Sequence, residues 1–268
     1  LLPSLRYVIY YPNNQLDSPP TGQHATDTFT YTLQNSVGNS DTATVTVTIT
    51  GENDVPTTVA DAINIGEDGS ATDLTTSLLS NDNDADTGET ATLQISSINA
   101  VTSTGSAQLN NGAVIYNPDG QFNSLSMGEI VTDSFQYSVQ DTHGAMSAES
   151  VVTITITGAN DPPTAVNDTA TTDQGTTTSI TFAELLSNDS DPDAGDSITI
   201  TAVDDSQTVG TIITQDGVIS YDPNGQFDTL AIGSIQTDSF VYNMSDDNGA
   251  SLLYTSPSPR DATLARMP

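Results

Sequence analysis

A repeat of about 107 residues is the feature that most constrains how this chain can fold. Asp54 recurs 107 residues later as Asp161, and other short motifs recur in the same order. These motifs are Leu78–Asp82 with Leu185–Asp189, Tyr116–Phe122 with Tyr221–Phe227, and Thr132–Tyr137 with Thr26–Tyr31 and Thr237–Tyr242. Several motifs in a constant order and spacing indicate tandem domains rather than one large core.

The boundary between repeats has a sequence pattern of its own. Val45–Asp61 and Val152–Asp168 each begin with Val or Ile alternating with Thr, which is typical of a half-buried strand. Gly-x-Asn-Asp-x-Pro follows and ends the strand, because Gly tolerates positive φ and Pro donates no ladder hydrogen bond. We interpret this pattern as the joint between two β domains.

The repeat register divides the chain into four parts. Residues 1–55 correspond to the C-terminal half of a first repeat, 56–162 to a complete repeat, and 163–251 to a third repeat without its last strand. In residues 252–268 the pattern breaks, and this run resembles a translated sequencing-adapter tail; the alternative is a natural linker. The chain starts with neither Met nor a signal-peptide pattern, so we expect a fragment of a longer protein.

Short alternating segments separated by turn signals predict the fold of each repeat. About seven such strands in roughly 107 residues are the signature of a Greek-key β-sandwich. We therefore predict an all-β protein of tandem Greek-key sandwiches, of the cadherin or immunoglobulin-like kind, arranged end to end.

Charge excludes several classes of function. The chain has 35 Asp and Glu against 3 Lys and Arg, a net charge of −32, and no basic residue lies between Tyr7 and Pro259. Such a surface repels nucleic acid and anionic membranes. Cysteine is absent, which excludes disulfides and thiolate metal sites, and no apolar run is long enough to span a bilayer.

Two Asp-rich segments predict a metal site. Asn81–Glu89 and Asn188–Asp196 carry Asp at every second position and then Gly, which places hard oxygen ligands on one side of a flexible loop. Ca²⁺ takes six to eight such ligands. The Gly position and the twelfth residues, Leu93 and Ile200, do not fit an EF-hand loop, so further ligands must come from elsewhere.

Antiparallel topology indicates where those ligands lie. The Asp-rich loop and the turn before the last strand should both return to the end of the repeat that carries the preceding joint. The alternative is that these Asp and Asn residues are simply good turn formers. The predicted ligands of Ca²⁺ are Asn53, Asp54, Asp61, Asp82, Asp84, Asp86, Glu89, Asp141, Asn160, Asp161, Asp168, Asp189, Asp191, Asp193, Asp196 and Asp246.

The combination of motifs resembles a known family. Asn160–Pro163, Leu185–Asp189, Tyr221–Phe227 and Thr237–Phe240 together resemble bacterial cadherin-like tandem repeats of the VCBS type, found in large secreted adhesins and RTX-type surface proteins. The resemblance covers residues 7–251 and implies calcium at the joints, contacts between neighbouring repeats of one chain, and an extracellular or cell-surface location. Other cell-surface molecules or polysaccharide are further partners to consider.

No motif supports an enzyme. The sequence contains no nucleophile elbow, zinc-protease helix, P-loop or dinucleotide fingerprint. His24 and His143 fall on equivalent ends of neighbouring repeats, too far apart for a zinc site shared by both. We therefore expect a calcium-stiffened spacer of an adhesin that acts in cell adhesion and biofilms, with a carbohydrate- or protein-binding module of a secreted protein or enzyme as the alternative.

Overall fold

The computed structural model describes residues 7–13, 16–252 and 263–264. The chain divides into two compact units, residues 1–65, 69–119 and 132–155 in the first, and residues 66–68, 120–131 and 156–268 in the second. The loops 66–68 and 120–131 of the middle repeat thus belong to the same unit as the third repeat. Glu67 lies in the first of these loops and is therefore part of the second unit.

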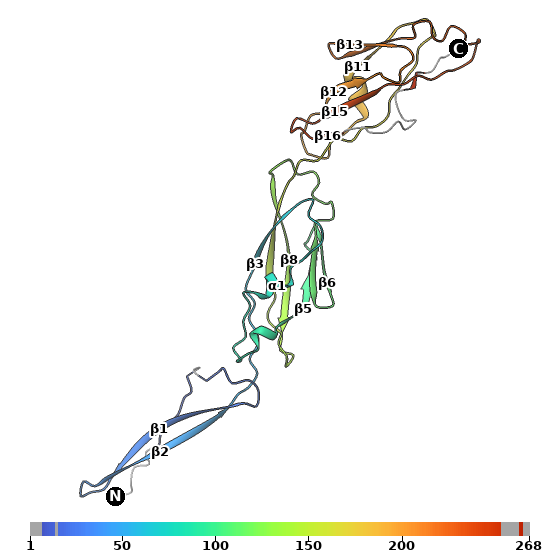
Figure 1. Cartoon of the computed structure of the whole chain (residues 1–268). Helices are drawn as coiled ribbons and strands as arrows, with labels where there is room; N and C mark the ends of the chain where they lie inside the picture. The colour runs from blue at the N-terminus through green and yellow to red at the C-terminus, as the bar shows by residue number, and fades with distance from the viewer. Residues whose placement is uncertain (1–6, 14–15, 253–262, 265–268) are drawn as a thin grey trace. The chain divides into compact units, whose positions relative to one another are not determined.

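The first repeat is a long hairpin. β1 (His24–Gln34) pairs antiparallel with β2 (Ser40–Thr50), from His24 opposite Thr50 to Gln34 opposite Ser40 (Figure 1). Only alternate apolar residues are half-buried, since no second sheet faces this hairpin within the described part of the chain.

The middle repeat contains two sheets (Figure 1). One sheet has four strands in the order β3-β9-β8-β5 and the other has three in the order β4-β7-β6. The elements are β3 (Asp61–Gly66), β4 (Thr72–Asp73), α1 (Thr75–Leu79), η1 (Thr90–Thr92), β5 (Gln94–Asn99), β6 (Ser106–Asn110), β7 (Ala113–Asn117), β8 (Ile130–Gln140) and β9 (Ser150–Thr157).

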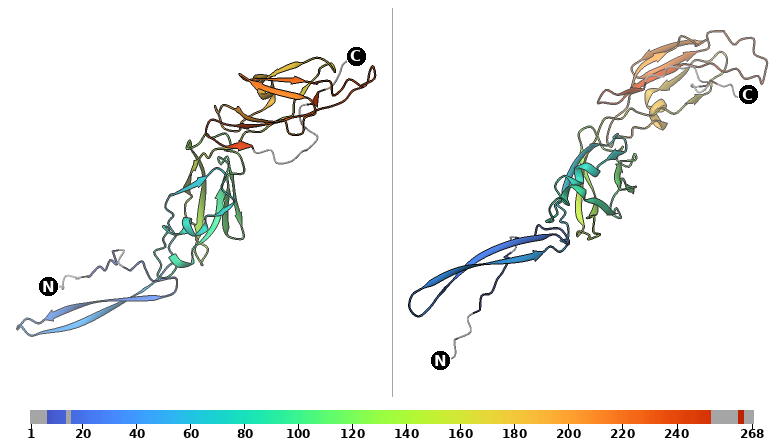
Figure 2. Two further views of the ribbon diagram at one scale, coloured as in Figure 1. Left: turned by 45° about the horizontal axis from the view of Figure 1, so that its top comes forward. Right: turned by 60° about the horizontal axis from the view of Figure 1, so that its bottom comes forward.

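The third repeat also has two main sheets, and Figure 2 shows it from two further directions. Its sheets are β12-β15-β16 and β11-β14-β13, and a short parallel pair joins β10 to β17. The elements are β10 (Thr169–Ala170), β11 (Thr178–Thr181), α2 (Phe182–Leu185), η2 (Leu186–Asn188), β12 (Thr199–Asp204), β13 (Thr211–Gln215), β14 (Val218–Asp222), β15 (Val241–Ser245), β16 (Ser251–Leu252) and β17 (Thr263–Leu264).

Apolar side chains that alternate along the strands form the hydrophobic core of the middle repeat. In β8 the side chains of Phe135, Tyr137 and Val139 are buried, and in β9 those of Val152 and Ile154 are buried. The third repeat buries Ile180, Leu185, Ile219 and Phe240 as its core. Several sheets and little helix confirm the predicted all-β class of tandem sandwiches.

A buried Asp–Tyr pair explains one of the recurring sequence motifs. The hydroxyl of Tyr116 donates to Asp133 Oδ2 at 2.7 Å, and Ser103, Thr104 and Gly105 donate to the same carboxylate. Tyr221 and Asp238 repeat the pair at 2.8 Å in the third repeat. The motif Thr-Asp-Ser-Phe therefore anchors a loop to the core.

Most of the tail lies outside the described residues. Residues 253–262 and 265–268, which belong to the run that resembles a sequencing-adapter tail, are not described. β16 pairs with β15 from Met244 to Ser245, and β17 pairs with β10. The short strand β16 therefore lies beside β15 in the third repeat, as β9 lies beside β8 in the middle repeat.

Candidate metal centres

A first acidic cluster lies where the chain enters the middle repeat. It consists of Asn53, Asp54, Asp84, Asp86, Glu89 and Asp141. The amide nitrogen of Asn53 donates to Asp141 Oδ2 at 2.8 Å. The backbone N–H of Asp54 donates to Asp86 Oδ2 at 2.9 Å, and that of Asp86 to Asp84 Oδ1 at 2.9 Å. The linker, the Asp-rich loop and the turn after β8 thus meet, as the topology predicts.

A second acidic cluster repeats this geometry in the second unit. It consists of Glu67, Asn160, Asp161, Asp191, Asp193, Asp196 and Asp246. Asn160 donates to Asp246 Oδ2 at 3.0 Å, the N–H of Asp161 to Asp193 Oδ2 at 2.9 Å, and the N–H of Asp193 to Asp191 Oδ1 at 2.9 Å. Equivalent residues therefore make equivalent bonds in both clusters.

Backbone structure holds the Asp-rich loops in place. Thr57 and Asn83 exchange both backbone hydrogen bonds, as do Thr164 and Ser190, so each loop is tied to its linker. Each loop then turns at a glycine with positive φ, 90° at Gly88 and 91° at Gly195, a conformation that favours Gly.

Buried oxygen atoms without hydrogen-bond partners gather in both clusters. In the first these atoms are Asn53 Oδ1, Asp84 Oδ2, Asp86 Oδ1 and Glu89 Oε2, and in the second they are Glu67 Oε2, Asn160 Oδ1, Asp161 Oδ2, Asp191 Oδ2 and Asp193 Oδ1. Asp86 is 1% and Asp193 3% exposed, whereas Asn53, Asn160, Asp161 and Asp191 are half-buried residues whose named oxygen atoms are buried. Because buried polar atoms are nearly always bonded, such a set calls for a bound group. All the atoms are hard oxygens, the donor set that fits Ca²⁺.

The raised pKa values of two cluster carboxylates also indicate that a cation binds in each cluster. Burial, followed by repulsion from Asp86, Asp17 and Asp84, raises the pKa of Asp54. Burial also raises the pKa of Asp161, with repulsion from Asp68, Asp193 and Asp191 adding to it. The charges in each cluster therefore oppose one another unless a cation or proton is bound.

Asp141 is held differently from its neighbours. Burial acts to raise its pKa, but hydrogen bonds from Asn53 and from three backbone N–H groups outweigh burial and lower it. Asp246 makes the matching bonds, from Asn160 and from the N–H groups of Gly249 and Ala250. The same hydrogen bonds therefore orient both carboxylates, and they favour the charged form of Asp141 that a cation requires.

Glu67 is a cluster residue that the sequence did not indicate. It follows β3, is 2% exposed, and accepts a hydrogen bond from Ala159 N at 2.6 Å. One oxygen each of Glu67, Asp161 and Asp193 lie within 4.8 Å of one another. Glu67-Asp68-Gly69 reads as a turn in the sequence, and only the fold of the second unit brings it to Asp161.

Four predicted ligands lie in separate hydrogen-bonded groups with tyrosine. Tyr137 donates to both oxygens of Asp82 at 2.9 and 3.0 Å, and Asn81 donates to Asp61 Oδ1. In the third repeat Tyr242 donates to Asp168 and Asp189, each at 3.0 Å. These carboxylates fasten the linker to the core, so we leave them out of the proposed ligand set.

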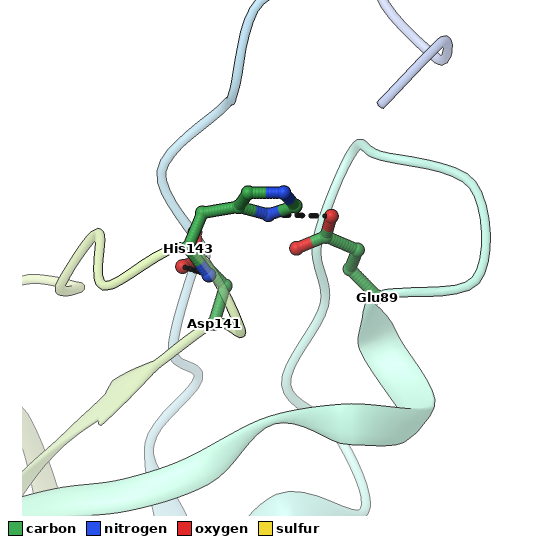
Figure 3. Close-up of side chains that lie close together, drawn as sticks. All are labelled: Glu89, Asp141 and His143. Carbon is green, nitrogen blue, oxygen red and sulfur yellow. Dashed lines mark hydrogen bonds and ion pairs between the residues drawn. The ribbon is translucent and has the colours of Figure 1, made fainter. Parts of the chain in front are cut away.

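The two clusters differ at one side-chain contact. In the first cluster, His143 Nδ1 lies 2.9 Å from Glu89 Oε1 (Figure 3). At the equivalent place in the second cluster, Asn248 donates to Asp196 Oδ2 at 2.7 Å. Thus a histidine and a longer carboxylate replace an asparagine and an aspartate.

Tandem β-sandwiches with acidic clusters beside their linkers define a class of repeat domain. The sequence profile described as "Bacterial cadherin-like domain" matches residues 53–158 and 160–255, and the chain therefore belongs to that family. The family's domains are extracellular, typically bind calcium, serve as adhesion or extender modules, contact neighbouring repeats or other cadherins, and are generally non-enzymatic.

The solved structures that match include extracellular fragments of protocadherins and a cadherin. The chain is 11% identical to the EC1–4 fragment of PcdhgB3, covering 92% of this chain and 67% of that one with a TM-score of 0.38. For mouse cadherin-23 EC22–24 the identity is 15%, the coverages 90% and 73%, and the TM-score 0.40. For the protocadherin gamma B4 extracellular domain the identity is 13%, the TM-score 0.36, and the chain covers 43% of that structure and 91% of its own length.

The comparison with curated protein sequences gives no match. Across the described residues, no helix has both the length and the apolar character needed to cross a membrane.

Proposed function

We propose that this chain is a calcium-stiffened spacer segment of a large secreted or cell-surface bacterial adhesin, with repeats of the VCBS type. The observation that carries the proposal is the set of buried oxygen atoms without partners, which occurs twice, once at each linker. Its partners are the neighbouring repeats of the same chain, and its role in adhesion or biofilm is mechanical rather than catalytic.

Charge supports a cation in these clusters. Two carboxylates about 4 Å apart repel by roughly 4 kcal/mol at an effective dielectric of 20. No Lys or Arg lies between Tyr7 and Pro259 to offset that repulsion. A divalent cation reverses its sign, and a loop that supplies several carboxylates suits Ca²⁺ better than Mg²⁺, which keeps more of its water.

The ligands proposed for the first cluster are Asn53, Asp54, Asp84, Asp86 and Asp141. Those for the second are Glu67, Asn160, Asp161, Asp191, Asp193 and Asp246. Because each set joins a linker to loops of a folded repeat, a bound ion restricts how the linker bends. Stiffness would then follow the calcium concentration of the surroundings.

Thermal melting and small-angle scattering of the whole chain test the proposal. Extracellular modules bind calcium with dissociation constants of roughly 10⁻⁴ to 10⁻³ M, and ligand at 100 times this value adds about 2.7 kcal/mol per site. We expect chelation to lower the melting temperature and to broaden the distribution of molecular dimensions. Identical melting and identical dimensions with calcium and with chelator would refute the proposed function.

A further inference from the structure

The first acidic cluster carries a nitrogen ligand that the second lacks. His143 and Glu89 occupy the places that Asn248 and Asp196 occupy one repeat later, with a glycine after the first residue and before the second in both repeats. A spacer that needs only oxygen ligands has no use for imidazole, because Ca²⁺ is bound by oxygen. The substitution therefore points to a different ion at this place.

The geometry around His143 forms a compact ligand set. One ligand atom each from Glu89, Asp141 and His143 lie within 4.8 Å of one another. Figure 3 shows the Glu89 carboxylate turned toward the imidazole, with Asp141 beside it. Glu89 is 6% exposed, and its Oε2 is buried without a partner among the described residues. A buried carboxylate oxygen with nothing to bond is a second sign that a cation belongs here.

We propose that Glu89, Asp141 and His143 form a binding site for a divalent transition metal of the Zn²⁺ class, present at the first cluster and missing from the second, with the Asp141 carboxylate shared between this ion and the adjacent calcium ion. Zinc takes imidazole nitrogen and carboxylate oxygen at about 2.0–2.2 Å, which puts two ligands of a tetrahedral ion about 3.4 Å apart. The 2.9 Å between His143 Nδ1 and Glu89 Oε1 needs only a small side-chain rotation to admit the ion.

The proposed zinc site is open to solvent on one side, and hydrogen bonds orient one of its ligands. The side chain of His143 is 40% exposed while that of Glu89 is 8% exposed, so an ion can enter from solvent and meet a buried anion. Asp141 is oriented by Asn53 and by the N–H groups of His143 and Ala145. Such supporting hydrogen bonds are usual around metal ligands. A fourth position is left for water.

Zinc titration of the whole chain tests this inference, with millimolar Ca²⁺ present throughout. The matched variants are His143→Asn, which gives the first cluster the residue of the second, and His24→Asn, which removes the chain's other histidine. We expect calorimetry to show one zinc site in the native chain and in His24→Asn. In His143→Asn zinc binding should weaken about tenfold or more.

Two further measurements make the outcome decisive. Zinc should shift the ring resonances of His143 and leave those of His24 unchanged. Asn248→His combined with Asp196→Glu should add a second zinc site at the second cluster. Equal zinc binding in His143→Asn, or no zinc binding by the native chain, would overturn the inference. Calcium-dependent melting of His143→Asn should match the native chain, so a failure of the zinc site is distinguishable from a failure of the proposed calcium function.

Discussion

At the scale of single residues, Asp193 and Asp86 are the central carboxylates of the two acidic clusters. Each uses one oxygen to hold its linker and leaves the other buried and unpartnered. Asp193→Asn should remove calcium binding at the second cluster alone, and Asp86→Asn at the first alone. Calorimetry should show the number of calcium sites fall in each variant while the other cluster still binds.

The control for these variants is Asp205→Asn, which makes the same charge change at an exposed position in the turn after β12. It should leave both calcium sites and the calcium-dependent rise in melting temperature unchanged. If Asp205→Asn weakened binding as much as Asp193→Asn does, general charge rather than specific ligation would explain the effect.

The carboxylate of Asp133 should matter for stability without calcium. Replacing it by Ala leaves the Tyr116 hydroxyl and backbone donors of the 103–105 loop buried without an acceptor, at a cost of about 3 kcal/mol or more. Urea unfolding of Asp133→Ala in calcium and in chelator measures this. A loss seen only in calcium would show that Asp133 acts through the metal instead.

Acid should stabilise the metal-free clusters. Burial is the first cause that raises the pKa of Glu67, Asp54, Asp161 and Asp191 above the ordinary values of 4.5 for Glu and 3.8 for Asp. Groups with a raised folded pKa bind more protons in the folded state, so stability falls as pH rises through that window. The melting temperature of metal-free protein should therefore fall from about pH 4.5 to pH 7.

Calcium should reverse this pH dependence, because the ion needs charged carboxylates and protons compete with it. Asp133 and Asp141 act at lower pH, since their pKa values lie below the usual 3.8 and their contribution is lost only under more acidic conditions. If the melting temperature of the metal-free protein rose steadily toward pH 7, the charged carboxylates of the acidic clusters would not be what destabilises it.

At the scale of elements, the β1–β2 hairpin buries much less apolar surface than the strands of the middle repeat. Tyr31 and Leu33 are 42% and 65% exposed, whereas Phe135 and Tyr137 of β8 are 1% and 0% exposed. Amide hydrogen exchange should be much faster in the hairpin than in β8 and β9, because local opening is governed by buried contacts. Equal protection would show that the hairpin is covered in solution.

The difference in burial between the hairpin and the middle repeat also predicts which part of the chain folds independently. We propose that residues 56–162 form the part that folds alone, since this repeat has both sheets and a continuous buried core. A cooperative melt of that fragment, and none for residues 1–55, is the expected result.

Elements and ligands that follow a local sequence pattern could be predicted, whereas those that depend on tertiary contacts could not. The strands were predictable because Val152 and Ile154 alternate with Thr, and the loop ligands Asp84 and Asp86 were predictable because their spacing recurs as Asp191 and Asp193. Glu67 was not, because its place in the second cluster depends on tertiary structure. The hydrogen bonds from Tyr137 to Asp82 and from Tyr242 to Asp189 could not be predicted either, because each joins residues that are more than 50 positions apart in the sequence.

At the scale of the whole molecule, the net charge of −32 makes the metal-free protein sensitive to salt. Screening acts over about 10 Å at 0.1 M ionic strength and weakens repulsion between carboxylates. Sodium chloride should raise the melting temperature of metal-free protein and change that of the calcium-loaded protein much less. If salt changed the two melting temperatures equally, the repulsion that salt screens would lie between surface carboxylates rather than within the acidic clusters.

Glu67 gives the second cluster a property that goes beyond ligand number. Its bond to Ala159 joins positions 92 residues apart in a chain that has no cysteine. An ion held by Glu67 and Asp161 would therefore close a long loop as a disulfide does, and a permanent crosslink of that length lowers the unfolded chain's entropy by the equivalent of about 4.6 kcal/mol. Under tension along the chain, it would be a reversible crosslink that reforms when the load is released, without redox chemistry.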